Sequence, residues 1–172
     1  MARVRHAAVK VALVLIAATV LASCSSARER ERFDQHGISF DVPAGWTVTG
    51  FSTTVTPRRL VAASYTVGAA DVEGDCGGLA AVERLPAKGA YVVLIDYGSH
   101  SIDRAEFTDR RPISALSDGQ LAAFECFGRS YAFRLMVRGR ALQAHVGIGG
   151  SADSRRRSDA LAVLNSLEAA AG

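Results

Sequence analysis

The stretch YAFRLMVRGRALQAHVGI, residues 131–148, decides the fold. Apolar side chains occupy positions 131, 133, 135 and 137, and again 142, 144, 146 and 148, on either side of the turn pair Arg138-Gly139. An apolar residue at every second position is typical of a strand with one buried face. Residues 121–127 add a third such segment, so the sequence predicts a three-stranded antiparallel meander with one face toward water. His145 falls on that water-facing side.

A helix is expected after this meander. Gly149-Gly150 ends the last strand, and Ser151 is a plausible N-cap. Leu161, Leu164 and Leu167 then recur at helical spacing. The pattern predicts a C-terminal helix whose apolar side lies across the sheet.

The residues before the meander predict further strands and one short helix. Alternation at residues 38–42 and 61–67, a Thr- and Val-rich segment at 46–55, and the apolar run at 91–95 each indicate a strand. Residues 79–85 indicate a short helix that ends at Pro86. The predicted fold class is therefore α+β, with an antiparallel sheet of about six or seven strands and a C-terminal helix packed on it.

The amino-terminal residues form a processing segment. Arg3, Arg5 and Lys10 precede an apolar run at residues 11–22, which is 12 residues long. A transmembrane helix needs about 20 residues, so the run indicates the apolar core of a signal peptide. It ends in Leu21-Ala22-Ser23-Cys24.

That ending resembles the lipobox of bacterial lipoproteins, in which a cysteine follows two small residues and an aliphatic one. The resemblance implies that Cys24 is acylated with diacylglycerol and becomes the first residue of the mature chain, on the outer side of a cell membrane. The expected organisation is a signal peptide at residues 1–23, a lipidated flexible tether at 24–36 and one domain at 37–170. A plain secretory leader with a chance cysteine is the alternative.

Composition and charge exclude some classes of protein. Apolar residues make up 49% of the chain, which excludes a disordered protein. The whole chain has 20 Lys+Arg against 17 Asp+Glu, and removal of the three leader cations leaves 17 against 17. A mature chain without net charge gives no reason to expect nucleic-acid binding.

Two cysteines remain when Cys24 is acylated. An even number in an exported domain predicts one disulfide, between Cys76 and Cys126. The string Gly-Asp-Cys-Gly-Gly at residues 74–78 also resembles the nucleophile loop of chymotrypsin-like proteases, with Cys76 in place of serine, so a cysteine-dependent enzyme is a remote alternative. We predict no cofactor.

Other clusters of chemically active residues give weaker evidence of a functional site. The alternating acids at positions 71, 73 and 75 lack the glycine and glutamate that an EF-hand needs, so they indicate a solvated loop or a loose cation site. His100, Ser101 and Asp103 carry the residue types of a catalytic triad, but triad members come from distant segments. Basic residues that could contact an anionic surface are Arg138, Arg140, Arg155, Arg156 and Arg157. The alternative for these arginines is a solvated face.

Three stretches together resemble exported bacterial lipoproteins with a PsbP-like α/β/α sandwich. They are GISFDVPAGW at residues 37–46, the aromatic-rich residues 128–140, and ALAVLNSL at 160–167. PsbP-like proteins mostly act as accessory or assembly factors of larger complexes, so the resemblance implies a non-catalytic module of a cell-envelope complex. The matched residues carry no catalytic role. The alternative is a binding module for a lipid, a wall polymer or a small ligand, with its site in the irregular residues 98–119.

Overall fold

The computed structural model describes residues 31–53, 56–74, 76–98 and 103–170. Cys24, the predicted lipidation site, lies outside these residues. The described chain is α+β and forms two antiparallel sheets. The smaller sheet has the strand order β1 (Glu31–Gln35), β2 (Ile38–Val42) and β9 (Glu168–Ala169). The larger sheet has the order β3 (Thr47–Val48), β4 (Arg58–Ala63), β5 (Ala90–Gly98), β8 (Arg140–Ile148), β7 (Gly128–Val137) and β6 (Gln120–Phe124).

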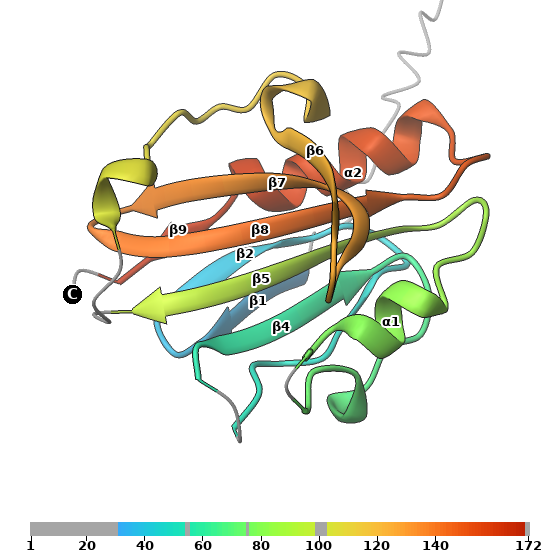
Figure 1. The fold of residues 1–172 in the computed structure, drawn as a ribbon, viewed down its shortest axis with the longest axis horizontal. Helices are drawn as coiled ribbons and strands as arrows, with labels where there is room; N and C mark the ends of the chain where they lie inside the picture. The colour runs from blue at the N-terminus through green and yellow to red at the C-terminus, as the bar shows by residue number, and fades with distance from the viewer. Residues whose placement is uncertain (1–30, 54–55, 75, 99–102, 171–172) are drawn as a thin grey trace, which may run out of the picture.

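Helical elements cover both faces of the larger sheet. Helix α2 (Ser154–Asn165) and the smaller sheet lie behind it in Figure 1, and α2 contacts β2, β5 and β8. Helix α1 (Leu79–Glu83) and the 3-10 turn η1 (Ala69–Asp71) lie in front of it. Strand β6 also crosses the front of the sheet, because the β6–β7 hairpin folds back over β8 and β5 toward α1. The prediction of an antiparallel sheet with a C-terminal helix packed on it is confirmed.

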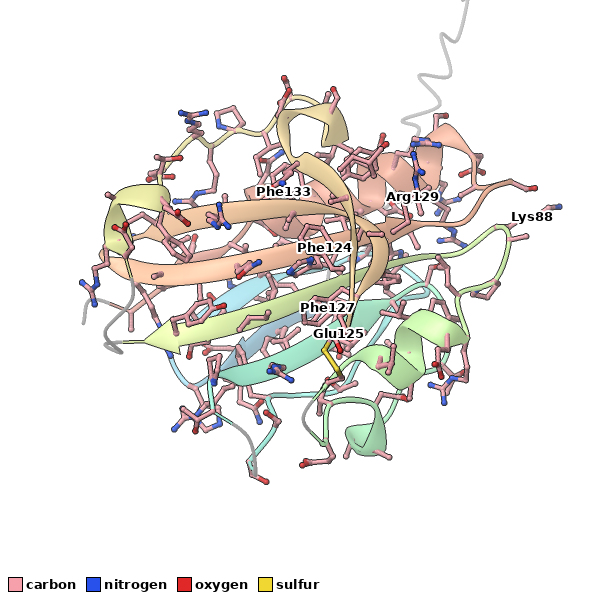
Figure 2. All side chains as sticks on the ribbon, viewed as in Figure 1. Lys88, Phe124, Glu125, Phe127, Arg129 and Phe133 are labelled. Carbon is pink, nitrogen blue, oxygen red and sulfur yellow. A yellow bond between two sulfur atoms is a disulfide. The ribbon has the colours of Figure 1, made fainter. Side chains whose placement is uncertain are left out.

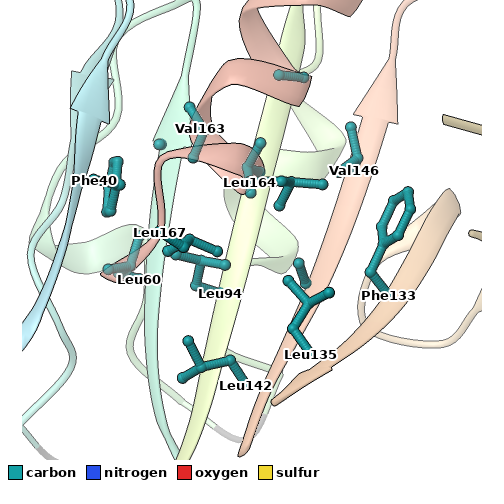
Figure 3. Close-up of a cluster of buried hydrophobic side chains, with 14 of the residues drawn as sticks. Phe40, Leu60, Leu94, Phe133, Leu135, Leu142, Val146, Val163, Leu164 and Leu167 are labelled. Carbon is teal, nitrogen blue, oxygen red and sulfur yellow. The ribbon is translucent and has the colours of Figure 1, made fainter. Parts of the chain in front are cut away.

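The main core lies between the larger sheet and the layer of α2 and β2. Leu60, Leu94 and Leu142 of the sheet meet Leu164 and Leu167, as Figure 3 shows. All five side chains are at most 1% exposed. This core uses the apolar residues that the alternation of β7 and β8 placed on one face, so that part of the pattern is confirmed.

A second core fills the opposite face of the same sheet. Val61, Tyr91 and Val93 pack there against Ala81 of α1 and Phe127 of the β6–β7 turn. Strand β5 contributes to both cores, with residues 91–95 at most 4% exposed. The apolar run at these positions therefore forms the doubly buried strand that the sequence predicts.

Strand β1 corrects the predicted boundary of the tether. We expected residues 24–36 to lack fixed structure, but Glu31–Gln35 pairs along its whole length with β2. Phe33 is its one apolar side chain, and it stacks on Phe40 with ring centroids 4.9 Å apart. Arg32 adds ion pairs to Asp41 and Glu168. A strand with four polar residues out of five has no apolar alternation by which the sequence could reveal it.

The other differences concern burial and boundaries. His145 is 1% exposed, so its predicted place on a water-facing side is wrong. The segment predicted as a strand at residues 46–55 contributes only the two residues of β3. The N-cap of α2 is Asp153, whose carboxylate accepts from Arg156 N–H, and not Ser151. Asp caps a helix as well as Ser does, so two neighbouring candidates could not be ranked by sequence.

Candidate functional site

A disulfide joins the loop before α1 to the β6–β7 turn, in front of the larger sheet. Cys76, just before α1, is bonded to Cys126 in the β6–β7 turn, with 5.0 Å between the Cα atoms. The predicted pairing is confirmed. Figure 2 shows the bond just below Phe127 and Glu125. The disulfide therefore fixes the tip of the hairpin over the sheet and leaves neither sulfur as a thiol.

The two glycines after Cys76 are required by packing and by backbone conformation. A Cβ on Gly77 would lie 2.4 Å from the Val72 carbonyl oxygen, and Gly78 has a φ of 107°. Gly77 N–H donates to the Gly74 carbonyl and Gly78 N–H donates to the Asp71 carbonyl, at 3.1 and 2.7 Å. These hydrogen bonds hold the loop against η1. Because Cys76 is bonded to Cys126, it lacks the free thiol that the protease-like interpretation requires of its nucleophile.

A series of hydrogen-bonded polar side chains, some buried and some half-buried, runs beneath the hairpin. Tyr97 O–H lies 2.9 Å from Gln143 Oε1, and Gln143 Nε2 lies 2.9 Å from His145 Nε2. His145 Nδ1 then lies 3.3 Å from Ser130 Oγ. Ser130 in turn bonds the Tyr91 hydroxyl, which donates to the Phe127 carbonyl at 2.6 Å.

These contacts fix the direction of every hydrogen bond in the chain. Because Tyr97 donates to Gln143 Oε1, the amide nitrogen of Gln143 donates to His145 Nε2. The proton of the neutral imidazole is then on Nδ1, and it points to Ser130. Each member donates one proton to the next, so the chain satisfies the polar atoms that the hairpin buries.

His145 stays neutral at ordinary pH. Its ring stacks on Phe127 with centroids 4.1 Å apart and meets the edge of Phe124 at 4.7 Å. Burial, and then the positive field of Arg134, lower the pKa of His145 to about 4. Ser130 is also only 1% exposed, so the Ser130–His145 contact holds the fold and does not form a nucleophile open to a substrate.

A pocket of about 310 Å³ opens beside these hydrogen-bonded side chains. Its apolar lining includes Ile95, Phe124 and Phe127, and its polar lining includes Arg59 and Tyr97. Burial raises the pKa of the Tyr97 hydroxyl above its usual value, and the positive charges of Arg59 and Arg134 offset part of this rise. Glu125 also lines it, so the charged lining has both signs. An apolar cavity with such a lining fits a small amphipathic molecule with a charged group. We call this cavity the histidine pocket.

A larger groove follows the outer edge of the sheet. It has a volume of about 570 Å³ and lies between β7 and the irregular segment 103–118, with Ile113, Phe133 and Leu135 as its apolar lining. Strand β6 covers β7 only from Gly128 to Ala132. Beyond that point the edge of β7 is paired with Thr108, whose N–H donates a hydrogen bond to the Arg134 carbonyl. We call this cavity the edge groove.

Charges of both signs surround the edge groove. Glu106, Arg110, Asp118 and Arg134 all line it, and Glu106 pairs with Arg134 at 3.2 Å. The Asp118 carboxylate accepts from Ser114 Oγ and N–H and from Ala115 N–H, and these bonds lower its pKa. The segment that the sequence marked as irregular therefore forms one wall of a groove with an apolar floor and a charged rim.

The five candidate arginines do not share one surface. Arg140 Nε and Nη2 donate to Asp96 at 2.8 and 2.5 Å, and its Nη1 donates to the His36 carbonyl. Asp96 is only 5% exposed, so Arg140 is used inside the fold and the pKa of its guanidinium is raised. Arg138 is exposed in the β7–β8 turn.

The remaining arginines lie at the opposite end of the domain. Residues 155–157 form the first turn of α2, which follows the far end of β8. Strand β8 has nine residues, so about 30 Å separate the two groups. Arg155 and Arg157 are exposed, while Arg156 is half-buried and lies 3.4 Å from Asp159.

The acidic candidates have structural roles. Asp71 is 5% exposed, pairs with Arg84 at 2.7 Å and accepts from Gly68 N–H. Asp103 caps the 3-10 turn η2 (Arg104–Glu106) by accepting from Ala105 N–H, and its predicted neighbours His100 and Ser101 lie outside the described residues. Within the described ranges, no group of three or more His, Cys, Asp or Glu side chains is arranged to hold a metal ion.

Comparisons with protein-family models, with curated proteins and with solved structures give no match to this chain. No helix among the described residues is long and apolar enough to span a membrane.

Proposed function

We propose that this protein is a membrane-anchored extracytoplasmic lipoprotein whose domain acts as a non-catalytic accessory or assembly module of a cell-envelope complex. The anchor is the acylated Cys24, and the edge groove is the surface that docks on the partner. The lipobox-like ending of the leader supports the anchor, and the Cys76–Cys126 disulfide fits an oxidising compartment. The resemblance of residues 37–46, 128–140 and 160–167 to PsbP-like lipoproteins supports an accessory role.

The edge groove is the observation that carries the docking role. Beside its apolar floor the groove is lined by two cations, Arg110 and Arg134, and by two anions, Glu106 and Asp118. A rim with both signs of charge is complementary to an extended peptide with mixed charge, and it is less suited to an acyl chain. The occupant we propose is therefore an extended segment of a cell-envelope protein.

Photocrosslinking in native membranes tests this role. A photoreactive residue replaces Gln120, which lines the groove, and a matched control replaces the neighbouring Leu121, which is 44% exposed. Because successive side chains of a strand point to opposite faces, only the first reaches the groove. We expect a crosslinked envelope protein from position 120 and none from 121. Recovery of only the uncrosslinked monomer from both positions contradicts the proposal.

A charge reversal supplies a second readout. Arg110→Glu reverses one of the two positive charges that line the groove, whereas Arg104→Glu makes the same change on an exposed residue that does not line it. A rim charge acts mainly through electrostatic complementarity, so the first variant should reduce the crosslink and the second should leave it unchanged. Equal yields from the two variants contradict docking in the groove.

The histidine pocket favours a second candidate function, the binding of a small amphipathic ligand. Its aromatic lining and the opposite charges of Arg59 and Glu125 fit an apolar molecule with a charged group. Native mass spectrometry of the protein purified from membranes should then show a bound small molecule, which Tyr97→Ala should release. A mass equal to that of the lipoprotein alone removes this candidate.

A further inference from the structure

The structure gives the domain two distinct ends. Glu31, where the described chain begins, pairs with Val42, and Trp46 follows the turn after Val42. Glu31 and Trp46 line one groove of about 510 Å³. On the larger sheet the same end carries Ala90, which pairs with Ile148. Figure 1 shows the start of α2 at this end and the β7–β8 turn at the other.

Exposed cations gather at the end that carries Glu31. Lys88 lies in the loop before β5, and its neighbour Ala87 bonds the chain just before α2, where Ser151 N–H donates to the Ala87 carbonyl at 2.8 Å. Figure 2 shows Lys88 pointing away from the domain at this end. Residues 155–157 contribute three consecutive arginines to the first turn of α2. Lys88, Arg155 and Arg157 form no ion pair with another residue of the described chain. We call this set the cationic end.

The position of the arginines on α2 is itself unfavourable. The first turn of a helix carries the positive end of the helix dipole, which favours anions and disfavours cations. Asp153 and Asp159 offset part of this charge through the N-cap and the pair with Arg156. Three arginines at this place would be stabilised by an external anionic surface.

The length of the tether limits which end can reach the membrane. Seven residue steps separate Cys24 from Glu31, and a fully extended chain spans about 25 Å over that distance. The far end, marked by Arg138, lies about 30 Å away along β8. With the strands upright, the cationic end can touch a membrane that holds Cys24, and the far end cannot.

We propose that the cationic end rests on anionic phospholipid headgroups, so that the domain stands with its β7–β8 turn away from the membrane. This inference rests on the anchor in the proposed function. Each arginine near an anionic lipid surface changes an equilibrium by roughly 5-fold, so removal of three shifts the orientation by about 100-fold. The attraction acts over a Debye length of about 8 Å, so added salt weakens it.

Energy transfer from Trp46 measures this orientation. Trp46 is the single tryptophan of the chain and lies at the cationic end. The mature lipoprotein is reconstituted into phosphatidylcholine vesicles, with or without phosphatidylglycerol, that contain a lipid with a dansyl headgroup as the acceptor. We expect more transfer on vesicles with phosphatidylglycerol than on those without it, and a loss of this difference in high salt.

Two matched triple variants separate the cationic end from net charge. In the first, Arg155, Arg156 and Arg157 are changed to Gln, and in the second the same change is made at the exposed residues 58, 104 and 138 of the far end. The first variant should lower transfer to the level seen on phosphatidylcholine alone, and its thermal midpoint should not fall, because the changes relieve a conflict with the helix dipole. The second should leave transfer as in the parent protein.

The outcomes distinguish this inference from the proposed function. Equal transfer from the two variants, on protein whose Cys24 peptide has the mass of a diacylglycerol adduct, overturns the orientation and leaves the anchor intact. A Cys24 peptide without that mass removes the anchor and with it the inference. Transfer from the parent protein that does not change with phosphatidylglycerol also overturns the orientation.

Discussion

His145 should make the stability of the domain depend on pH. In the folded protein burial lowers its pKa to about 4, against 6.5 for an exposed histidine. Between these two values the unfolded chain binds a proton that the folded protein does not bind, so stability falls as the pH falls through this range. Each pKa unit is worth 1.36 kcal/mol, which gives a loss of about 3 kcal/mol between pH 7 and pH 4.

The substitution His145→Asn removes this proton-binding difference and keeps a polar side chain between the two phenylalanine rings. Urea unfolding of the parent and the variant at pH 7.5, 6.5, 5.5 and 4.5 gives the free energy of unfolding at each pH. The parent should lose about 2.5 kcal/mol more than the variant over that series. The comparison uses the slope with pH, so a lower stability of the variant at neutral pH does not affect it.

His36 supplies the control for this experiment. It is exposed in the β1–β2 turn, so His36→Asn makes the same substitution without changing the buried contacts of His145. Equal slopes for the parent and His145→Asn refute the reasoning, because they show that the imidazole takes up a proton in the folded protein as easily as in the unfolded chain.

Three further perturbations test the packing. Replacement of both Cys76 and Cys126 by Ser opens a loop with a sequence separation of 50, so the free energy of unfolding in urea should fall by about 4 kcal/mol. A fall below about 1 kcal/mol means that the hairpin is held in place without the disulfide. Arg140→Met leaves the Asp96 carboxylate buried without its partner, so thermal unfolding should show a loss of about 3–5 kcal/mol, and an unchanged midpoint contradicts the pairing. Gly147→Ala places a Cβ 2.0 Å from a tyrosine ring, so it should cost about 1–3 kcal/mol by overpacking, and a neutral effect in urea unfolding contradicts that contact.

Local periodicity was sufficient to predict the strands and helix that form the main core. Strands β7 and β8 and helix α2 show it most clearly, because their apolar residues recur at the period of the element they form. Strand β5 was also predictable, since a run of large apolar residues between loops has no face that tolerates water. In each of these elements the burial of side chains and the local conformation favour the same structure.

The candidate site was less predictable because it depends on contacts between distant residues. His145 alternates with core residues and so was expected to face water, but the β6–β7 hairpin folds over it and brings Phe124 and Phe127 onto its ring. Arg140 resembled any exposed arginine, since its partner Asp96 is 44 residues away at the end of an apolar strand. The sequence alone gives no sign of either contact.

The sequence indicated the place of the edge groove but not that of the histidine pocket. The irregular segment after β5 was expected to carry function, and it forms a wall of the edge groove. The histidine pocket gave no local signal, because its lining comes from four separated stretches that include Arg59, Tyr97, Phe124 and Gln143. The register of β4, β5 and β8 brings Arg59, Tyr97 and Gln143 together, and the folded β6–β7 hairpin adds Phe124.

Non-reducing peptide mapping of the protein extracted from native membranes tests the lipid anchor and the closed disulfide together. We expect an amino-terminal Cys24 peptide with the mass of a diacylglycerol adduct, together with a crosslinked peptide that contains Cys76 and Cys126. An unmodified Cys24 contradicts the lipid anchor. A Cys76 that reacts with an alkylating reagent without prior reduction contradicts the closed, non-catalytic domain and restores the loop around Cys76 as a reactive site.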